Sequence, residues 1–242
     1  MKPVKMPQMI LFDYGDTLGW EEPFNSPAGV RAVMEHCTAN PHSYSPEEVD
    51  AVGAGLFAEL QAVRTLDFEG HNLIAQRLQY ELMGIELAIS AEEAEYIYWE
   101  NVAPGHPTPG SAELLAYLNK KGIRTGVISN IGFSGGALAR RIAGLFPEHP
   151  FEFILASSEY LVRKPNPMLF RVALAKAGLG PEGVWYCGND AYFDVKGSAS
   201  AGLFPVWYRG MDRTSAPAPE GTPPHLEVGS WDELRGILEG LL

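Results

Sequence analysis

The sequence has few cysteines and no long apolar run. Its two cysteines, Cys37 and Cys187, stand apart from any CxxC or His-rich pattern, so we predict buried thiols and neither a disulfide framework nor a structural zinc site. No segment approaches the roughly 18 consecutive apolar residues of a membrane-spanning helix. Residues 1–8 lack the apolar centre of a secretory signal. We therefore expect a cytoplasmic protein that does not associate with a membrane.

Basic residues are also scarce relative to acidic ones. The chain has 18 Lys+Arg against 30 Asp+Glu, which gives a formal net charge of −12. A surface of this sign repels the phosphate backbone of nucleic acids over most of its area, so polymeric nucleic acid is a poor ligand for it. A small anionic substrate stays compatible, because a metal ion or a lysine can create local positive charge in an acidic protein.

Short apolar runs alternate with helical segments over most of the chain. The expected strands are residues 9–12, 124–128, 153–155, 184–187, 205–208 and 226–228. The expected helices between and after them are residues 111–121, 167–177, 193–201 and 231–241. This alternation predicts parallel strands joined by helical crossovers, which is a doubly wound α/β sheet of the Rossmann-like type.

The region from residue 19 to residue 103 has a different character. It contains no convincing strand, and two capping boxes mark the starts of helices, at Ser45 to Glu48 and at Ser90 to Glu93. Its aromatic residues fall at helical spacings among leucines and alanines, so we expect them to pack rather than to bind a substrate. We predict a core of residues 1–18 and 104–242 and a helical cap of residues 19–103.

Polar residues follow several of the predicted strands. In an open parallel sheet, ligands gather beyond the carboxyl ends of the strands. Four loops of this kind carry polar groups, namely residues 13–17, Ser129 with Asn130, residues 163–165, and residues 188–190 with Asp194 one turn later. Each motif alone is weak, because aspartate and serine often end strands as turn caps. Their joint order along the chain is the stronger signal.

These four motifs, in this order, resemble the haloacid dehalogenase-like superfamily over almost the whole chain. The resemblance implies that Asp13 is a covalent nucleophile, that Ser129 binds the transferred group, and that Lys164 neutralises nucleophile and phosphate. It also implies that Thr17 closes the first motif and that Asp194 belongs to the acidic motif. The residues expected to contact the phosphate are Thr17, Ser129, Asn130 and Lys164.

The chemistry implied by this resemblance is phosphate ester hydrolysis with Mg²⁺. A carboxylate can attack a phosphoryl group to form an aspartyl-phosphate, which water then cleaves. Mg²⁺ and a lysine offset the repulsion between the two anions. The expected metal ligands are Asp13, the carbonyl of Gly15, and Asp190 or Asp194.

Two positions depart from the family's phosphatases. These usually carry a second aspartate two residues after the nucleophile, where it protonates the leaving oxygen, and here that residue is Gly15. Asp16 is a poor substitute because it lies one residue further on. The acidic motif usually begins with aspartate directly after its glycine, whereas this chain has Asn189. We therefore expect weak metal affinity.

Three functions are compatible with the sequence. The leading one is a Mg²⁺-dependent phosphatase for a small phosphorylated metabolite, acting as a monomer or homodimer. Gly15 also suits a metal-free 2-haloacid dehalogenase, whose nucleophile motif lacks the second aspartate, whereas Asp190 beside Asp194 favours the phosphatase. A binding module with little catalysis is the third reading, because a fold alone does not establish an activity.

Overall fold

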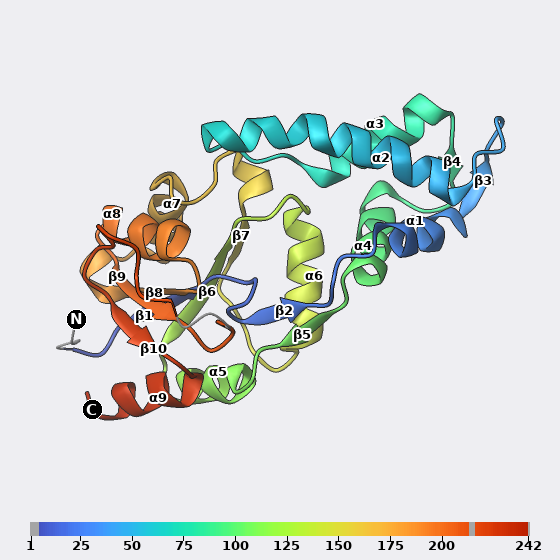
Figure 1. The fold of residues 1–242 in the computed structure, drawn as a ribbon. Coiled ribbons are helices and arrows are strands. Elements are labelled where there is room, and N and C mark those ends of the chain that lie inside the picture. Colours follow the sequence, from blue (N-terminus) through green and yellow to red (C-terminus); the bar gives the residue numbers. More distant parts are fainter. Residues whose placement is uncertain (1–4, 213–215, 242) are drawn as a thin grey trace.

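The core of the protein is a six-stranded sheet, and the computed structural model describes residues 5–212 and 216–241. The strands are β1 (Met9–Phe12), β6 (Arg124–Ser129), β7 (Ile154–Ala156), β8 (Val184–Gly188), β9 (Phe204–Tyr208) and β10 (Leu226–Val228). They lie in the order β10-β9-β8-β1-β6-β7, and every neighbouring pair is parallel (Figure 1). The predicted α/β class is therefore confirmed.

Helices cover both faces of this sheet, because alternate side chains of a strand point to opposite faces. Ile10 and Phe12 of β1 join one apolar cluster, whereas Met9 and Leu11 join another. The first cluster includes residues of α5 (Ser111–Lys120), α6 (Gly135–Leu145) and α9 (Trp231–Glu239). The second includes residues of α7 (Met168–Ala177). This two-sided burial explains why the strands read as continuous apolar runs.

The strand order reverses beside β1, and this reversal locates the site. From β1 the chain proceeds outward through β6 and β7, then returns to the other side of β1 and proceeds outward through β8, β9 and β10. The loops that follow the carboxyl ends of β1 and β8 therefore lead away from each other. Such a switch point is where open α/β sheets bind ligands.

A group of helices lies apart from the sheet (Figure 1). It contains α1 (Ser26–Met34), α2 (Pro46–Leu60), a 3-10 helix η1 (Gln61–Leu66), α3 (Asn72–Met83) and α4 (Ala91–Val102). These helices have their own apolar cluster, which includes Val33, Val49 and Tyr80. Two strands, β2 (Gly19–Glu21) and β5 (Gly105–Pro107), pair antiparallel where the chain enters and leaves this group.

The expectation of no strand between residues 19 and 103 was wrong. Besides β2, the strands β3 (Cys37–Ala39) and β4 (Glu86–Leu87) form an antiparallel pair there. Strands of two or three residues are too short to show an alternating pattern, so nothing local distinguishes them from loop. Ser45 and Ser90 do cap their helices, since they accept hydrogen bonds from the backbone N–H groups of Glu48 and Glu93. The reciprocal bond of a capping box is present at Ser45, whose N–H donates to Glu48, whereas the Glu93 carboxylate binds Arg140.

The remaining elements are short turns around the sheet. They are the 3-10 helices η2 (Ser157–Tyr160) and η3 (Pro181–Gly183), the π-helical turn η4 (Ala191–Lys196), and α8 (Gly197–Ser200). The helix predicted at residues 193–201 is thus a π-helical turn followed by a short α-helix. Within the described ranges, no helix has the length and apolar character needed to cross a bilayer.

Candidate active site

Lys164 is the centre of a buried charged cluster at the switch point of the sheet. Its side chain is 1% exposed, and Nζ donates to Asp13 Oδ1 at 2.8 Å, to Asp194 Oδ1 at 2.6 Å and to the Tyr186 hydroxyl at 2.7 Å. An ammonium group has three donors, so these contacts use its full capacity. The three partners of Lys164 lie 22 to 151 positions from it in sequence, so only the fold brings them together.

The surroundings of Asp13 perturb its ionisation. Burial raises the pKa of the Asp13 carboxyl to about 6, although the Lys164 ammonium acts in the opposite direction. Burial by itself would lower the pKa of Lys164, but its attraction to Asp13 and Asp194 outweighs this and raises it. At neutral pH, Asp13 is therefore largely an anion beside a lysine that stays charged. This is the state that a carboxylate nucleophile requires.

The loop after β1 holds Asp13 at the sheet edge. The Asp13 backbone N–H donates to the Cys187 carbonyl at 2.9 Å, which extends the β1–β8 pairing by one residue. Asp16 has a left-handed backbone with φ of 51°, which lets the chain turn sharply. Thr17 is fully buried, and its hydroxyl donates to Asn189 Oδ1 at 3.4 Å. The first and last motifs are thus in contact.

Asn130 holds the backbone of Lys164. Its side-chain Nδ2 donates to the Lys164 carbonyl at 2.9 Å, and its Oδ1 accepts from the Lys164 backbone N–H at 2.7 Å. Both ends of the amide are occupied, so Asn130 acts as a positioning residue for Lys164. Ser129, the last residue of β6, is 3% exposed and directly precedes Asn130 in sequence.

Asp190 and Asp194, the expected metal ligands of the last motif, already have protein partners. Asp194 accepts from Lys164 and Tyr186 through Oδ1, and from the Asp190 backbone N–H through Oδ2 at 2.9 Å. Asp190 Oδ1 accepts from the backbone N–H groups of Tyr192 and Phe193, each at 2.7 Å. Aspartate is a strong helix N-cap, so the start of η4 competes with a metal for this carboxylate.

A smaller donor set remains for a metal ion. Across residues 5–212 and 216–241, no three His, Cys, Asp or Glu side chains gather where they could hold a metal. The expected set needs only two carboxylates, Asp13 and either Asp190 or Asp194, with the Gly15 carbonyl, so it stays a prediction. Asp13 and the carbonyl of Gly15 are still hard oxygen donors in one loop. They fit Mg²⁺ in its common form, in which one or two carboxylates, waters and the substrate phosphate complete the shell.

Gly15 leaves an open place where the usual acid would stand. A Cβ atom added there meets no heavy atom within 4 Å. Asp16 does not fill this place, because it borders a separate cavity with Asn189, Asp190 and Trp207. Neither Gly15 nor Asp16 borders the larger cavity that begins at Asn130. The geometry therefore offers no acid from this loop to that cavity.

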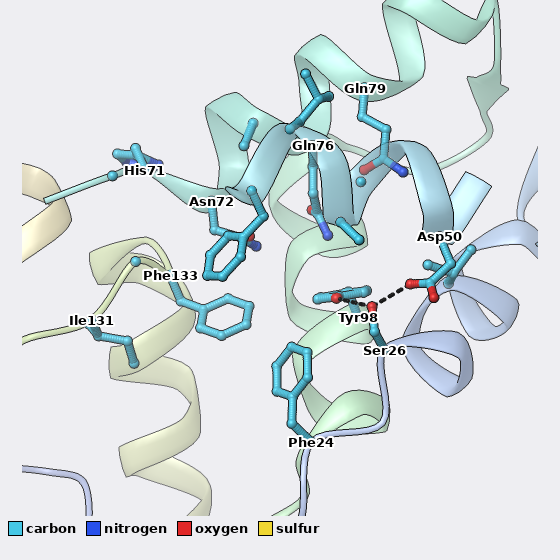
Figure 2. Close-up of a pocket in the computed structure, with 18 of the residues that line it drawn as sticks. Phe24, Ser26, Asp50, His71, Asn72, Gln76, Gln79, Tyr98, Ile131 and Phe133 are labelled. Atoms are coloured by element: carbon cyan, nitrogen blue, oxygen red, sulfur yellow. Dashed lines mark hydrogen bonds between the residues drawn. The ribbon is translucent and has the colours of Figure 1, made fainter. Parts of the chain in front are cut away.

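The larger cavity lies between the helical group and the core, and it has a volume of about 390 Å³. Its wall joins the loop from Asn130 to Phe133 with residues of the helical group that include Phe24, Phe57 and Gln76 (Figure 2). Phe24 is 64% exposed and Phe57 is 51% exposed. The expectation that the aromatic residues of this region pack was therefore wrong for these two and for Phe68, which is 48% exposed, although it holds for Trp99 and Tyr80.

Periodicity could not have separated these two groups of aromatic side chains. Phe57 and Tyr80 both occupy helices, and only their orientation differs. Gln76 was missed for the same reason, since a lone glutamine on a helix carries no signal in sequence. The nearest hint was the position of Phe24, which precedes α1 and so lies outside any helical stripe.

Comparison with known proteins places these features in a family. Residues 72–207 match the sequence model of the haloacid dehalogenase-like hydrolases. A phosphoserine phosphatase from Thermus thermophilus is 32% identical over 52% of this chain and 49% of its own length. A pyrimidine 5'-nucleotidase from Escherichia coli is 32% identical over 54% of this chain and 56% of its own length. This chain thus spans about half the length of these curated relatives.

Other relatives align along the whole chain at lower identity. A glyceraldehyde 3-phosphate phosphatase from Methanopyrus kandleri is 24% identical over 98% of this chain and 99% of its own. Among solved structures, a 2-haloacid dehalogenase from Pseudomonas syringae superposes with a TM-score of 0.66 at 20% identity, covering 98% of this chain and all of its own. A phosphatase from Thermococcus onnurineus gives 0.63 at 21% identity, covering 99% of both chains. These structures share the fold of this chain.

Proposed function

The chain belongs to the haloacid dehalogenase-like hydrolases, and from this premise we propose that it hydrolyses a small phosphomonoester through an aspartyl-phosphate on Asp13. The observation that carries the proposal is the contact of the Lys164 ammonium with both Asp13 and Asp194 inside the sheet. A pure binding module has no need for a buried nucleophile held ionised in this way. The phosphatase names of several relatives support the same chemistry.

The proposed reaction has two steps. A carboxylate oxygen of Asp13 attacks phosphorus, the bond from phosphorus to the leaving oxygen breaks, and that oxygen takes a proton from solvent because Gly15 supplies none. Water then attacks the phosphorus of the aspartyl-phosphate, which releases inorganic phosphate and restores the Asp13 carboxylate. Lys164 keeps Asp13 ionised and oriented and offers positive charge to the phosphoryl group.

Mg²⁺ is part of this proposal. When ionised, Asp13 and Asp194 outnumber Lys164, so the cluster by itself is net negative toward a phosphate dianion. Asp13 and the Gly15 carbonyl would hold the ion, with Asp190 as a further ligand if it leaves the start of η4. The ion supplies charge neutralisation for the phosphoryl oxygens. Asn130 and Asp194 position Lys164, since Asn130 bonds to its backbone and Asp194 to its ammonium.

The test is release of inorganic phosphate from a panel of phosphomonoesters, measured once with about millimolar Mg²⁺ and once in excess chelator. We expect turnover with Mg²⁺, none in chelator, and a phosphorylated Asp13 peptide by mass spectrometry after rapid quenching. No phosphate release from any ester would overturn the proposal. The remaining features that we propose are a cytoplasmic location and a monomeric or homodimeric state.

A second candidate is a metal-free 2-haloacid dehalogenase. The observation that favours it is the commitment of Asp194 and Asp190 to Lys164 and to η4, which leaves a single aspartate for a metal. In that reaction Asp13 would attack carbon and displace a halide. Chloride release from 2-chloropropionate in excess chelator, with no phosphate release in Mg²⁺, would favour the dehalogenase over the phosphatase.

A further inference from the structure

The larger cavity points to a class of substrate. We propose that it receives the leaving group of the phosphomonoester, and that this group carries an uncharged aromatic or heteroaromatic ring with a polar edge facing Gln76. The proposal rests on the phosphatase activity proposed above and goes further by naming the substrate class. It is built from the side chains of the wall, the partners of its charged groups and the missing acid at Gly15.

The wall of the cavity is aromatic on several sides. Phe24, Tyr98 and Phe133 come from three separate segments and point toward one another (Figure 2). The Tyr98 ring centroid lies 6.5 Å from that of Phe24 and 6.4 Å from that of Phe133. Phe133 is fixed by stacking on Trp99 at 4.2 Å. Rings held at such spacings offer faces and edges to another flat ring.

Two aromatic side chains that border the cavity are largely exposed to solvent. Phe24 and Phe57 expose 64% and 51% of their surface, although both border the cavity. Exposed apolar rings that surround a cavity lose contact with water when a ligand enters, and this favours apolar ligands. A triose or a phosphoserine side chain has no ring to cover them and would leave most of the cavity to water.

Gln76 provides the polar group of this wall. It is 8% exposed, it borders the cavity, and its Oε1 atom is buried without a hydrogen-bond partner. A buried acceptor without a partner is destabilising, so a donor on the ligand would recover that loss. The neighbouring Gln79 is different, because its Nε2 donates to the Val49 carbonyl at 2.6 Å. Gln76 is therefore an acceptor that can read a ring edge, beside Asn72 Nδ2 and His71 Nδ1, which also belong to cavity-lining residues and lack a hydrogen-bond partner.

The charged groups of the wall are already paired with protein groups. Arg64 contacts Glu69 at 2.7 Å, and Glu21 accepts from Arg141 at 3.0 Å. Asp50 accepts from the Ser26 hydroxyl, which also lies 2.9 Å from the Tyr98 hydroxyl. A charged leaving group would have to displace these partners or remain unpaired, which is costly in a partly buried site. The wall thus favours an uncharged ring.

The catalytic loop points in the same direction. Because Gly15 offers no acid, ester hydrolysis is easier when the leaving oxygen accepts negative charge well, as a phenol does. Asn130 borders the cavity and bonds to the backbone of Lys164, whose ammonium contacts Asp13. Asp13 and Ser129 do not border the cavity themselves, so in this proposal the phosphate lies beside it and only the leaving group extends into it. Two kinds of substrate carry such a ring. In an aryl phosphate the leaving alcohol is a phenol, and in a nucleoside 5'-phosphate it is a primary alcohol.

The first test compares matched esters. Benzyl phosphate and ethyl phosphate are both esters of primary alcohols, and only one carries a ring. We expect kcat/KM to be about tenfold or more higher for benzyl phosphate, a ratio within reach of one aromatic contact set. Phenyl phosphate and uridine 5'-phosphate distinguish an aryl phosphate from a nucleoside 5'-phosphate as the preferred substrate. The first has a phenol as its leaving group and no polar ring edge, whereas the second has a polar ring edge and a primary alcohol as its leaving group. Phosphoserine serves as the small charged comparator.

Variants connect this preference to the wall. Phe57→Ala and Phe24→Ala should each lower kcat/KM for benzyl phosphate by about 3- to 10-fold and leave ethyl phosphate within about twofold. Gln76→Met should lower kcat/KM for uridine 5'-phosphate and leave benzyl phosphate unchanged. Leu82→Ala is the matched control, because Leu82 is 68% exposed on α3 and does not border the cavity.

The outcomes separate this inference from the proposed function. Turnover of ethyl phosphate or phosphoserine at least as efficient as that of benzyl phosphate would leave the phosphatase standing and overturn the inference. If no ester is hydrolysed, the proposed function fails, and calorimetry then decides the inference through binding of benzylphosphonate against ethylphosphonate. Equal binding of the two phosphonates overturns it, and preference for benzylphosphonate that is lost in Phe57→Ala supports it.

Discussion

Replacing Lys164 by methionine is the most informative single perturbation of this site. The change keeps most of the side-chain volume and removes the ammonium, which leaves Asp13 and Asp194 as two carboxylates without a cation. Their side chains are 13% and 1% exposed, so solvent can compensate little of the lost charge. Removing one partner of a buried ion pair costs about 3–5 kcal/mol. We expect the free energy of unfolding to fall by about that amount at pH 8, together with loss of turnover.

The pH dependence of this loss follows from the direction of the pKa shifts. In the folded wild type, the pKa of Asp13 is already raised to about 6 by burial, and Lys164 opposes that rise. Without Lys164 the pKa rises further, so the folded variant binds a proton that the unfolded chain has released. Stability of the variant therefore falls as pH increases between the unfolded pKa near 3.8 and the raised folded pKa, and it recovers on acidification.

The assay is urea denaturation of wild type and Lys164→Met at pH 8 and at pH 5.5, in chelator so that metal does not bind either protein. We expect a smaller difference in the free energy of unfolding between the two proteins at pH 5.5 than at pH 8. Asn119→Ala, an exposed substitution on α5, serves as the control without pH dependence. An equal loss at both pH values would refute the role of Lys164 as the cation that keeps buried carboxylates ionised.

Three further variants test the chemistry. Asp13→Asn should abolish phosphate release while the urea midpoint changes little, because the amide has the same shape and is a far weaker nucleophile; wild-type turnover would show that Asp13 is not the nucleophile. Gly15→Asp should flatten a steep dependence of rate on leaving-group pKa across aryl and alkyl phosphates, since there is open space for its side chain; a shallow dependence in wild type would mean that another group already donates the proton. Asn189→Asp should lower the Mg²⁺ concentration needed for half-maximal activity by adding a carboxylate beside the first loop, as measured by metal titration; an unchanged midpoint would place the metal elsewhere.

The fold was readable from the sequence because its signals are local. The apolar run of β1 and its neighbours identifies buried strands, and the glycines after the helices mark where those helices end. Gly178, for example, follows α7 with a left-handed backbone, as a helix-terminating glycine requires. Short strands such as β3 and β4 escaped because two or three residues carry no periodicity.

The sequence by itself determined the doubly wound core and the order in which polar residues follow its strands. The tertiary structure alone decided what each polar group is bonded to. Asn130 bonds to the backbone of Lys164, and Asp194 to its ammonium, because these groups become neighbours only when the chain folds. Phe57 likewise borders a cavity rather than a core, since the space around a helix is set by elements distant in the chain. Local pattern encodes the elements, whereas hydrogen-bond partners and cavities depend on contacts between segments far apart in sequence.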